Sequence, residues 1–155
     1  MVEPGSRPVP DRHRFHGSRV VVTGGARGIG AEIARSFARE GACVAVLDRL
    51  ADEGAAVASD IGGVFVECDL GTASGTADGT GAAIAQLGGI DVLANNAGIF
   101  RITPLLDIDA DEWDAMFAVN VRSMLVSIQV AARAMIAAGN GGRIVNMASM
   151  GGKRG

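Results

Sequence analysis

The sequence has no tyrosine, a single tryptophan and two cysteines among its 155 residues. Cys43 and Cys68 lie in apolar, strand-like runs, far from any CxxC pair or Cys/His cluster. This scarcity and spacing exclude a disulfide scaffold and a zinc site. We therefore expect two buried, reduced thiols and no metal.

Excess positive charge is also missing. The net charge is -3 and the isoelectric point is near 5.3, which argues against nucleic acid or anionic lipid as a partner. No segment has the uninterrupted apolar length of a membrane span, and the first residues lack the apolar core of a signal peptide. We expect a cytoplasmic protein without a membrane partner.

What is present is typical of one folded domain. Hydrophobic residues make up 48% and charged residues 20%, so the chain is apolar enough to bury a core. Residues 1–17 are polar and proline-rich, and we expect a disordered leader there, with His13 and His16 as part of a solvated tail. Residues 18–155 then form the single domain.

Apolar runs alternate with helix-length segments along this domain. The expected strands cover residues 19–23, 43–47, 63–67, 90–94 and 143–147. The runs are continuously apolar rather than alternating, as in parallel strands that are buried on both faces. The pattern predicts an α/β fold with a Rossmann-like, doubly wound parallel sheet.

Three helical segments carry specific expectations. Residues 29–40 have helical periodicity, and Gly41 should end that helix. The four glycines within residues 71–81 should delay the next helix until about Ala82. Residues 109–138 should form one long helix, with Asp109 as N-cap and Glu112 in capping-box position. This helix is apolar around much of its circumference, so it should be covered by another helix or another subunit.

A glycine loop joins the first strand to the first helix. It reads Thr-Gly-Gly-Ala-Arg-Gly-Ile-Gly over residues 23–30. Glycines allow a sharp turn and let a pyrophosphate approach the helix N-terminus, where free N–H groups favour negative charge. The strand before and the helix after the loop are the context that this interpretation requires.

The second strand ends at Asp48, where a carboxylate would meet the adenosine ribose of a dinucleotide. A carboxylate accepts hydrogen bonds from both ribose hydroxyls and repels a 2′-phosphate, so Asp48 favours NAD over NADP. Arg27 and Arg49 leave the alternative open, because a guanidinium can hold that phosphate. Asp48 could also be an ordinary turn residue at a strand end.

Five motifs occur in order. They are the glycine loop at 23–30, Asp69 after the third strand, Asn-Asn-Ala-Gly at 95–98, Asn120 in the long helix, and Ser149 after the fifth strand. In this order they resemble the short-chain dehydrogenase/reductase family, from about residue 17 onward. Taken singly, each residue could be an ordinary turn or helix residue.

The resemblance implies roles for these positions. The cofactor-binding residues would be Gly24, Arg27, Gly28, Ile29, Gly30, Asp48, Asp69, Leu70, Asn96 and Gly98. Asp69 would bond the adenine amino group, and residues 95–98 would brace the central sheet. Asn120 would hold a water in a proton relay, and Ser149 would orient the oxygen of an alcohol or carbonyl substrate. The stretch around Ser149 is similar to family members that act on polyols.

The family's proton chemistry needs a tyrosine with a lysine four residues later. The sequence has no tyrosine, and Lys153 lies only four residues after Ser149. Two hypotheses follow. In the first, which we favour because Asn120 and Ser149 are kept, the chain is an inactive fragment of an NAD-dependent oxidoreductase, its sheet incomplete at the C-terminal strands and the long helix joining a homo-oligomer. In the second it is a complete, non-catalytic NAD-binding or interaction module.

Overall fold

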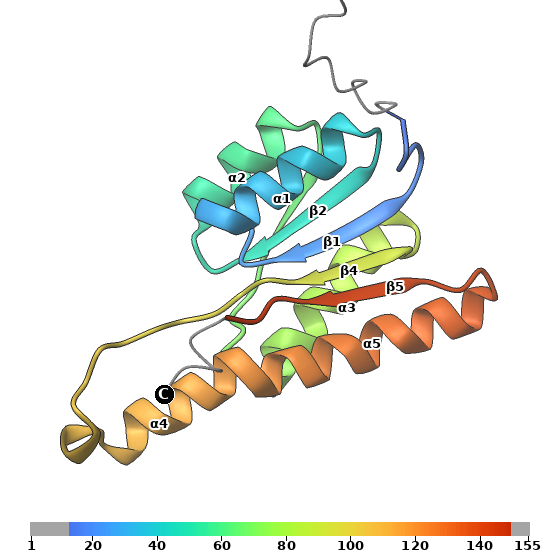
Figure 1. The fold of residues 1–155 in the computed structure, drawn as a ribbon. Helices are drawn as coiled ribbons and strands as arrows, with labels where there is room; N and C mark the ends of the chain where they lie inside the picture. The colour runs from blue at the N-terminus through green and yellow to red at the C-terminus, as the bar shows by residue number, and fades with distance from the viewer. Residues whose placement is uncertain (1–12, 150–155) are drawn as a thin grey trace, which may run out of the picture.

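The computed structural model describes residues 13–149 and contains one parallel sheet (Figure 1). Its five strands are arranged in the order β3-β2-β1-β4-β5. Their bounds are Arg19–Thr23 (β1), Cys43–Asp48 (β2), Val64–Glu67 (β3), Val92–Asn95 (β4) and Arg143–Asn146 (β5). The predicted α/β, doubly wound fold is confirmed. All four residues of β5, the last strand of this order, are exposed.

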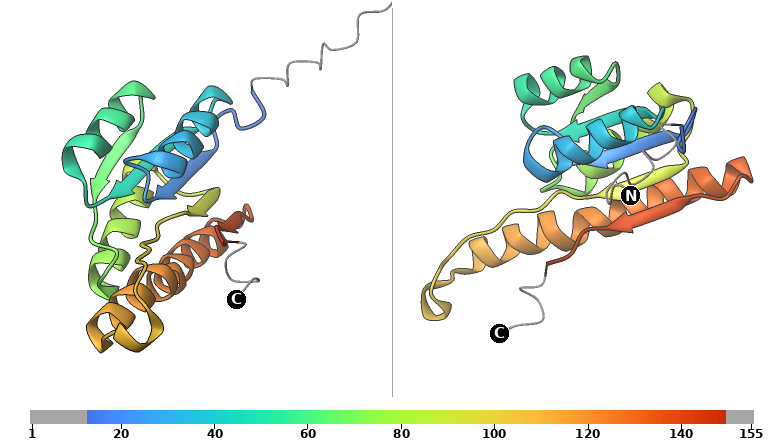
Figure 2. Two further views of the ribbon diagram at one scale, coloured as in Figure 1. Left: turned by 60° about the vertical axis from the view of Figure 1, so that its left-hand side comes forward. Right: turned by 45° about the horizontal axis from the view of Figure 1, so that its top comes forward.

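Helices cover both faces of the sheet (Figures 1 and 2). The first face carries α1 (Gly28–Arg39) and α2 (Ala51–Asp60), and the other carries α3 (Ala73–Leu87) and α5 (Ser123–Ala138). Alternate strand residues divide between the two layers, so that Val20 and Val22 pack with one core cluster and Val21 with the other. This two-sided burial is why the strands have no polar alternation.

Gly41 ends α1 as predicted. Its φ is +88°, in the left-handed region that glycine adopts without strain, and its N–H donates to the Ala38 carbonyl at 2.9 Å.

The expected start of α3 near Ala82 is wrong, because the helix begins at Ala73 with the Thr72 hydroxyl accepting from the Gly75 N–H at 3.0 Å. A Cβ on Gly75 would lie 2.6 Å from the Asp69 carbonyl oxygen, and one on Gly79 would lie 2.5 Å from Cys68 Sγ. These glycines permit close packing of helix on strand, which offsets their low helix propensity.

The segment 109–138 begins as predicted but is not one regular α-helix. The Asp109 carboxylate caps it by accepting from the Glu112 N–H at 2.7 Å. In a capping box the Glu112 side chain would bond back to the Asp109 N–H. Here the Glu112 carboxylate instead accepts from the Thr103 hydroxyl at 3.0 Å. After a short 3₁₀ turn, η1 (Leu105–Asp107), the chain forms α4 (Ala110–Phe117), a π-helical turn η2 (Ala118–Arg122), and α5.

By length and composition alone, Ala110–Ala138 could cross a membrane, with a mean hydropathy of 1.4 over its most apolar window. This is the one such segment in the described part of the chain, and it departs from our expectation of none. One side of α5 packs on α3 and the sheet, and core helices of folded domains meet the same criterion.

Residues 13–17 pack against α1. Arg14 forms an ion pair with Glu40 at 2.7 Å, and the Phe15 ring lies edge-on to Phe37 with centroids 4.9 Å apart. Residues 1–12 of the expected leader lie outside the described residues. The described residues also contain no group of three or more potential metal ligands.

The cysteines are both free, but only Cys68 is buried, whereas Cys43, at the start of β2, is exposed. The expectation of two buried thiols is therefore wrong for Cys43.

Candidate functional site

A cavity of about 270 Å³ lies at the carboxyl ends of the strands. Strand order reverses between β1 and β4, and open α/β sheets bind ligands at such a switch point. The lining includes every residue predicted to bind a cofactor except Gly28. These residues are Gly24, Arg27, Ile29, Gly30, Asp48, Asp69, Leu70, Asn96 and Gly98. They are joined by Arg49, Leu50, Cys68, Gly71, Ala97, Ile99 and Val119, most of which had no signal in the sequence.

The glycine loop approaches neighbouring backbone too closely for side chains. A Cβ on Gly24 would lie 2.7 Å from the Ala97 Cα, and one on Gly30 would collide with the Gly24 carbonyl. Gly28, which starts α1, has a φ of +57°. Arg27 precedes α1 in an extended conformation and makes no side-chain cap. The Arg27 side chain therefore does not cap the first N–H groups of α1, and an anion could accept hydrogen bonds from them.

The Asp48 carboxylate lies at the end of β2 beside this loop. Its Oδ2 accepts from the Ala26 N–H at 3.0 Å, and its Oδ1 accepts from the Leu50 N–H at 3.1 Å. Each oxygen keeps a further lone pair. Asp48 therefore clamps the glycine loop, a role that the sequence did not indicate, and still presents acceptors to the cavity.

Asn96 and Thr23 tie the ends of β1 and β4 together. The Asn96 side-chain amide donates to the carbonyls of Thr23 at 3.2 Å and Gly24 at 3.1 Å. The Thr23 hydroxyl oxygen accepts from the N–H groups of Asn96 and Ala97, both at 3.1 Å. Thr23 was noted only as part of a motif, because its partners follow another strand.

Asn95 joins β4 to strand β5 and to helix α5. Its Nδ2 donates to Asn146 Oδ1 at 2.9 Å, and its Oδ1 accepts from the Ser127 hydroxyl at 2.8 Å. The contacts fit the bracing role that the resemblance implied for residues 95–98. Ser127 was missed, although a serine in such an apolar helix needs an acceptor when buried.

The loop between β3 and α3 forms another wall of the cavity. Asp69 is exposed, and its Oδ1 accepts from the Gly71 N–H at 2.9 Å, while Leu70 is buried. Cys68 also lines the cavity, and burial raises the pKa of its thiol to about 11, with smaller contributions from nearby carboxylates. This thiol is protonated and unreactive at neutral pH.

Asn120 lies in η2, and its side chain is engaged at both ends. Its Oδ1 accepts from the Ile99 N–H at 2.8 Å, and its Nδ2 donates to the Ile99 carbonyl at 2.9 Å. A Cβ on Gly98 would lie 3.4 Å from Asn120 Oδ1, so the loop after β4 sits directly against this amide. Asn120 therefore fixes that loop, and its part in a proton relay stays a prediction.

Ser149 is exposed and follows the end of β5, on the same edge of the sheet as the cavity. Lys153 lies outside the described residues. All the predicted cofactor residues except Gly28 thus converge on one cavity.

Comparison with known proteins assigns the chain to a family. A family model described as short chain dehydrogenase matches residues 18–155. The chain belongs to the short-chain dehydrogenase/reductase family. The resemblance noted in the sequence is confirmed over that range.

Similar proteins include a sorbitol dehydrogenase from Cereibacter sphaeroides, 39% identical over 144 residues, covering 92% of this chain and 56% of that protein. A D-threitol dehydrogenase from Mycolicibacterium smegmatis is 37% identical over 141 residues, covering 88% of this chain and 54% of that protein. The crystal structure of a short-chain type dehydrogenase/reductase from Mycobacterium marinum is 35% identical, with a TM-score of 0.84, covering 90% of this chain and 58% of that chain. The chain thus spans a little over half the length of these relatives.

Proposed function

We propose that this chain forms the NAD-binding part of an oxidoreductase that exchanges a hydride between NAD and an alcohol or carbonyl carbon. The observation that carries the proposal is the cavity in which the glycine loop, Asp48 and the 95–98 loop meet. Glycines that exclude side chains, with the start of a helix behind them, suit a pyrophosphate. Bound NAD would supply the hydride chemistry at C4 of its nicotinamide.

Asp48 supports NAD rather than NADP. Its two oxygens each hold one backbone N–H and keep an acceptor site for a ribose hydroxyl. A 2′-phosphate placed there would meet a carboxylate, although Arg27 and Arg49 line the same cavity.

The proposed substrate is a secondary alcohol of the polyol class. This rests on the sorbitol and D-threitol dehydrogenases among the similar proteins. Ser149 would position the substrate oxygen, and Asn120 would support the proton relay while holding the loop at Ile99. The sequence has no tyrosine to serve as the family's general acid/base, so we propose that these 155 residues bind NAD without turning over substrate.

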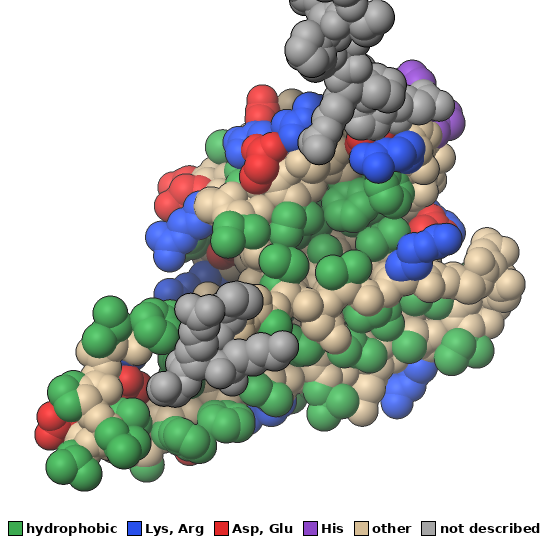
Figure 3. All heavy atoms as spheres, viewed as in Figure 1, with side chains coloured by type: hydrophobic (Ala, Val, Ile, Leu, Met, Phe, Trp, Pro, Cys, Tyr) green, Lys and Arg blue, Asp and Glu red, His purple; other side chains and the backbone are tan. Residues whose placement is uncertain are grey.

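We also propose that a second copy of the chain covers the outer face of α4–α5. Trp113, Phe117, Val121 and Leu125 recur every four residues there and are 48% to 56% exposed. We call these four residues the apolar stripe. Figure 3 shows hydrophobic side chains, in green, gathered at the end of the molecule where α4 lies, at the lower left of the view. Contiguous apolar surface of this kind marks an interface.

Calorimetry of the purified chain tests the proposal, with NAD and NADP titrated separately. We expect NAD to bind more tightly than NADP. No binding of either would refute the proposed function, and tighter NADP binding would refute the role of Asp48. Turnover of a polyol panel by this chain would contradict the argument from the missing tyrosine.

A further inference from the structure

The π-helical turn η2 holds two walls of the cavity at once. From one position, Asn120 binds both backbone groups of Ile99 in the loop after β4. Two residues later, the Arg122 guanidinium donates from Nη2 to the Gly71 carbonyl at 2.8 Å, in the loop between β3 and α3. Side chains two positions apart on a helix do not face each other, so the two residues reach different loops.

Helix α3 already holds the loop at residues 69–72 through the side chain of Thr76. The Thr76 hydroxyl donates to the carbonyl of Thr72 at 2.7 Å and lies 3.5 Å from that of Leu70. Within the loop, the Gly71 N–H donates to Asp69 Oδ1. Arg122 adds a contact from a different helix to Gly71, the residue that lines the cavity beside Asp69 and Leu70.

We propose that Arg122 is a positioning residue that fixes the β3–α3 loop as the adenosine wall of the nucleotide site. The inference rests on the proposed function, because it assigns that loop to the adenosine half of NAD. Arg122 lines an outer groove rather than the cavity itself, so it acts through Gly71 and need not touch the nucleotide. A guanidinium donor to a carbonyl is a charge-assisted bond, which is stronger than a neutral one.

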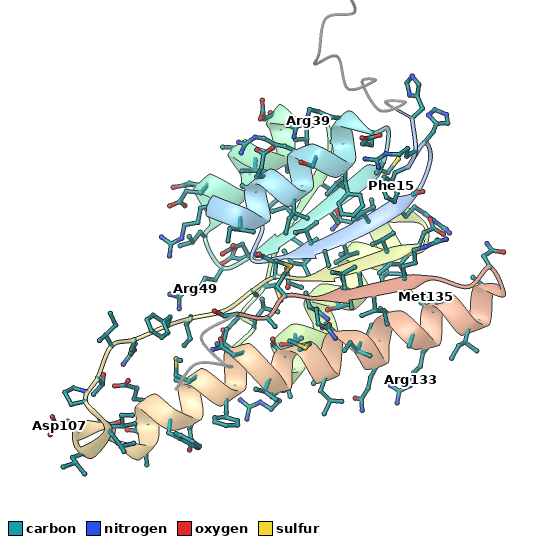
Figure 4. All side chains as sticks on the ribbon, in the orientation of Figure 1. Phe15, Arg39, Arg49, Asp107, Arg133 and Met135 are labelled. Carbon is teal, nitrogen blue, oxygen red and sulfur yellow. The ribbon has the colours of Figure 1, made fainter. Side chains whose placement is uncertain are left out.

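Three variants of the full 155-residue chain test this role. Arg122→Met keeps most of the aliphatic stem and removes the donors, whereas Arg122→Lys keeps the charge and a donor. The control is Arg133→Met, since Arg133 is an exposed arginine on α5 that points away from the sheet and has no hydrogen-bond or ion-pair partner among residues 13–149 (Figure 4). Each chain is titrated with NAD and with AMP, which carries the adenosine half alone.

We expect Arg122→Met to weaken both NAD and AMP about fivefold, the loss of one such hydrogen bond at an exposed site. Arg122→Lys should recover most of that loss, and Arg133→Met should bind like the wild type. Backbone amide exchange in residues 69–72, measured without ligand, should be faster in Arg122→Met and unchanged in the control.

Three results would overturn the assignment. The first is AMP affinity within twofold of wild type in Arg122→Met, and the second is unchanged exchange in residues 69–72. The third is an equal loss of affinity in the Arg133→Met control. If the wild-type chain binds neither NAD nor AMP, the proposed function fails and this inference fails with it, which distinguishes that case from a defect confined to Arg122.

Discussion

Asp48 and Ala26 are joined by a hydrogen bond from the Ala26 N–H to Asp48 Oδ2, at 3.0 Å and across 22 positions of the chain. The residue expected to choose the cofactor therefore also holds the glycine loop. Neutralising the Asp48 carboxylate should therefore change nucleotide binding, whereas removing the whole side chain should also release the glycine loop.

Asp48→Asn keeps one carbonyl acceptor for a backbone N–H but loses the negative charge. We expect NAD affinity to fall about tenfold or more, as for a lost hydrogen bond to a charged group, and the preference for NAD over NADP to shrink. Calorimetry with both nucleotides measures this. Glu53→Gln, an exposed charge change in the first turn of α2, is the control and should bind as wild type. If the ratio of the NAD and NADP affinities were unchanged in Asp48→Asn, Asp48 would not be the residue that selects NAD over NADP.

Gly30→Ala should abolish nucleotide binding and destabilise the fold. Its Cβ would collide with the Gly24 carbonyl and lie 2.5 Å from Asn96 Nδ2. Gly81→Ala is the matched change, because a Cβ on Gly81 meets nothing within 4 Å inside α3. That variant should gain about 0.5–1 kcal/mol in free energy of unfolding. Denaturant unfolding of both variants tests the pair, and equal effects would refute the close-approach argument.

The Arg19–Asp91 ion pair should make stability depend on pH in acid. Arg19 donates to Asp91 Oδ2 at 2.8 Å and lowers the pKa of that carboxyl from 3.8 to about 2. A carboxyl whose pKa is depressed by folding stabilises the protein above its unfolded pKa, and this stability is lost as pH falls from about 4 to about 2.

Since the pair is partly exposed, we expect a contribution of about 1 kcal/mol. In urea unfolding between pH 6 and pH 2, Asp91→Asn should be less stable than wild type at pH 6, and the difference should shrink toward pH 2. A constant difference over that range would contradict the pKa assignment.

The two cysteines should react differently. Cys68 is buried with a pKa of about 11, whereas Cys43 is exposed. Brief treatment of the native chain with iodoacetamide at pH 7.5 should modify Cys43 and leave Cys68 intact. Peptide mass spectrometry measures the sites, and denatured protein, in which both react, is the control.

The apolar stripe should mediate self-association. Phe117→Glu or Leu125→Glu should shift the chain to the monomer in sedimentation velocity, because each would bury an unpaired charge in the interface. Gln86→Glu places the same charge at an exposed position of α3, a helix that carries none of the stripe, and should leave the assembly unchanged. A wild-type chain that sediments as a monomer would remove the case for this interface.

Much of the fold followed from local pattern. The run at Val20–Val22 predicted a strand buried on both faces, and Gly41 predicted the end of α1, since each depends on the residue and its neighbours. The glycine loop and Asp48 predicted where the cavity would lie, since strand order in a doubly wound sheet brings these ends together.

The errors come from contacts that are distant in sequence. The glycines of α3 looked like helix breakers, but Gly79 is needed because a Cβ there would lie only 2.5 Å from Cys68 Sγ. The π-helical turn was not foreseen, because Asn120 is bound by Ile99, a residue of the preceding loop. Arg122 had no signal, since its acceptor is a main-chain carbonyl that any residue type would provide.

The turn η2 has a consequence for the geometry of the outer face. In a regular α-helix, residues spaced by four advance about 40° around the axis at each step, because a turn holds 3.6 residues. Over the three steps from Trp113 to Leu125 they would wind away from a straight line. A π-helical turn holds more residues, so η2 restores the phase midway. With one residue deleted from 118–122, the remaining four could wind as ordinary α-helix through about 400°, so that α4 would keep its orientation against α5 while the π-helical turn itself is lost.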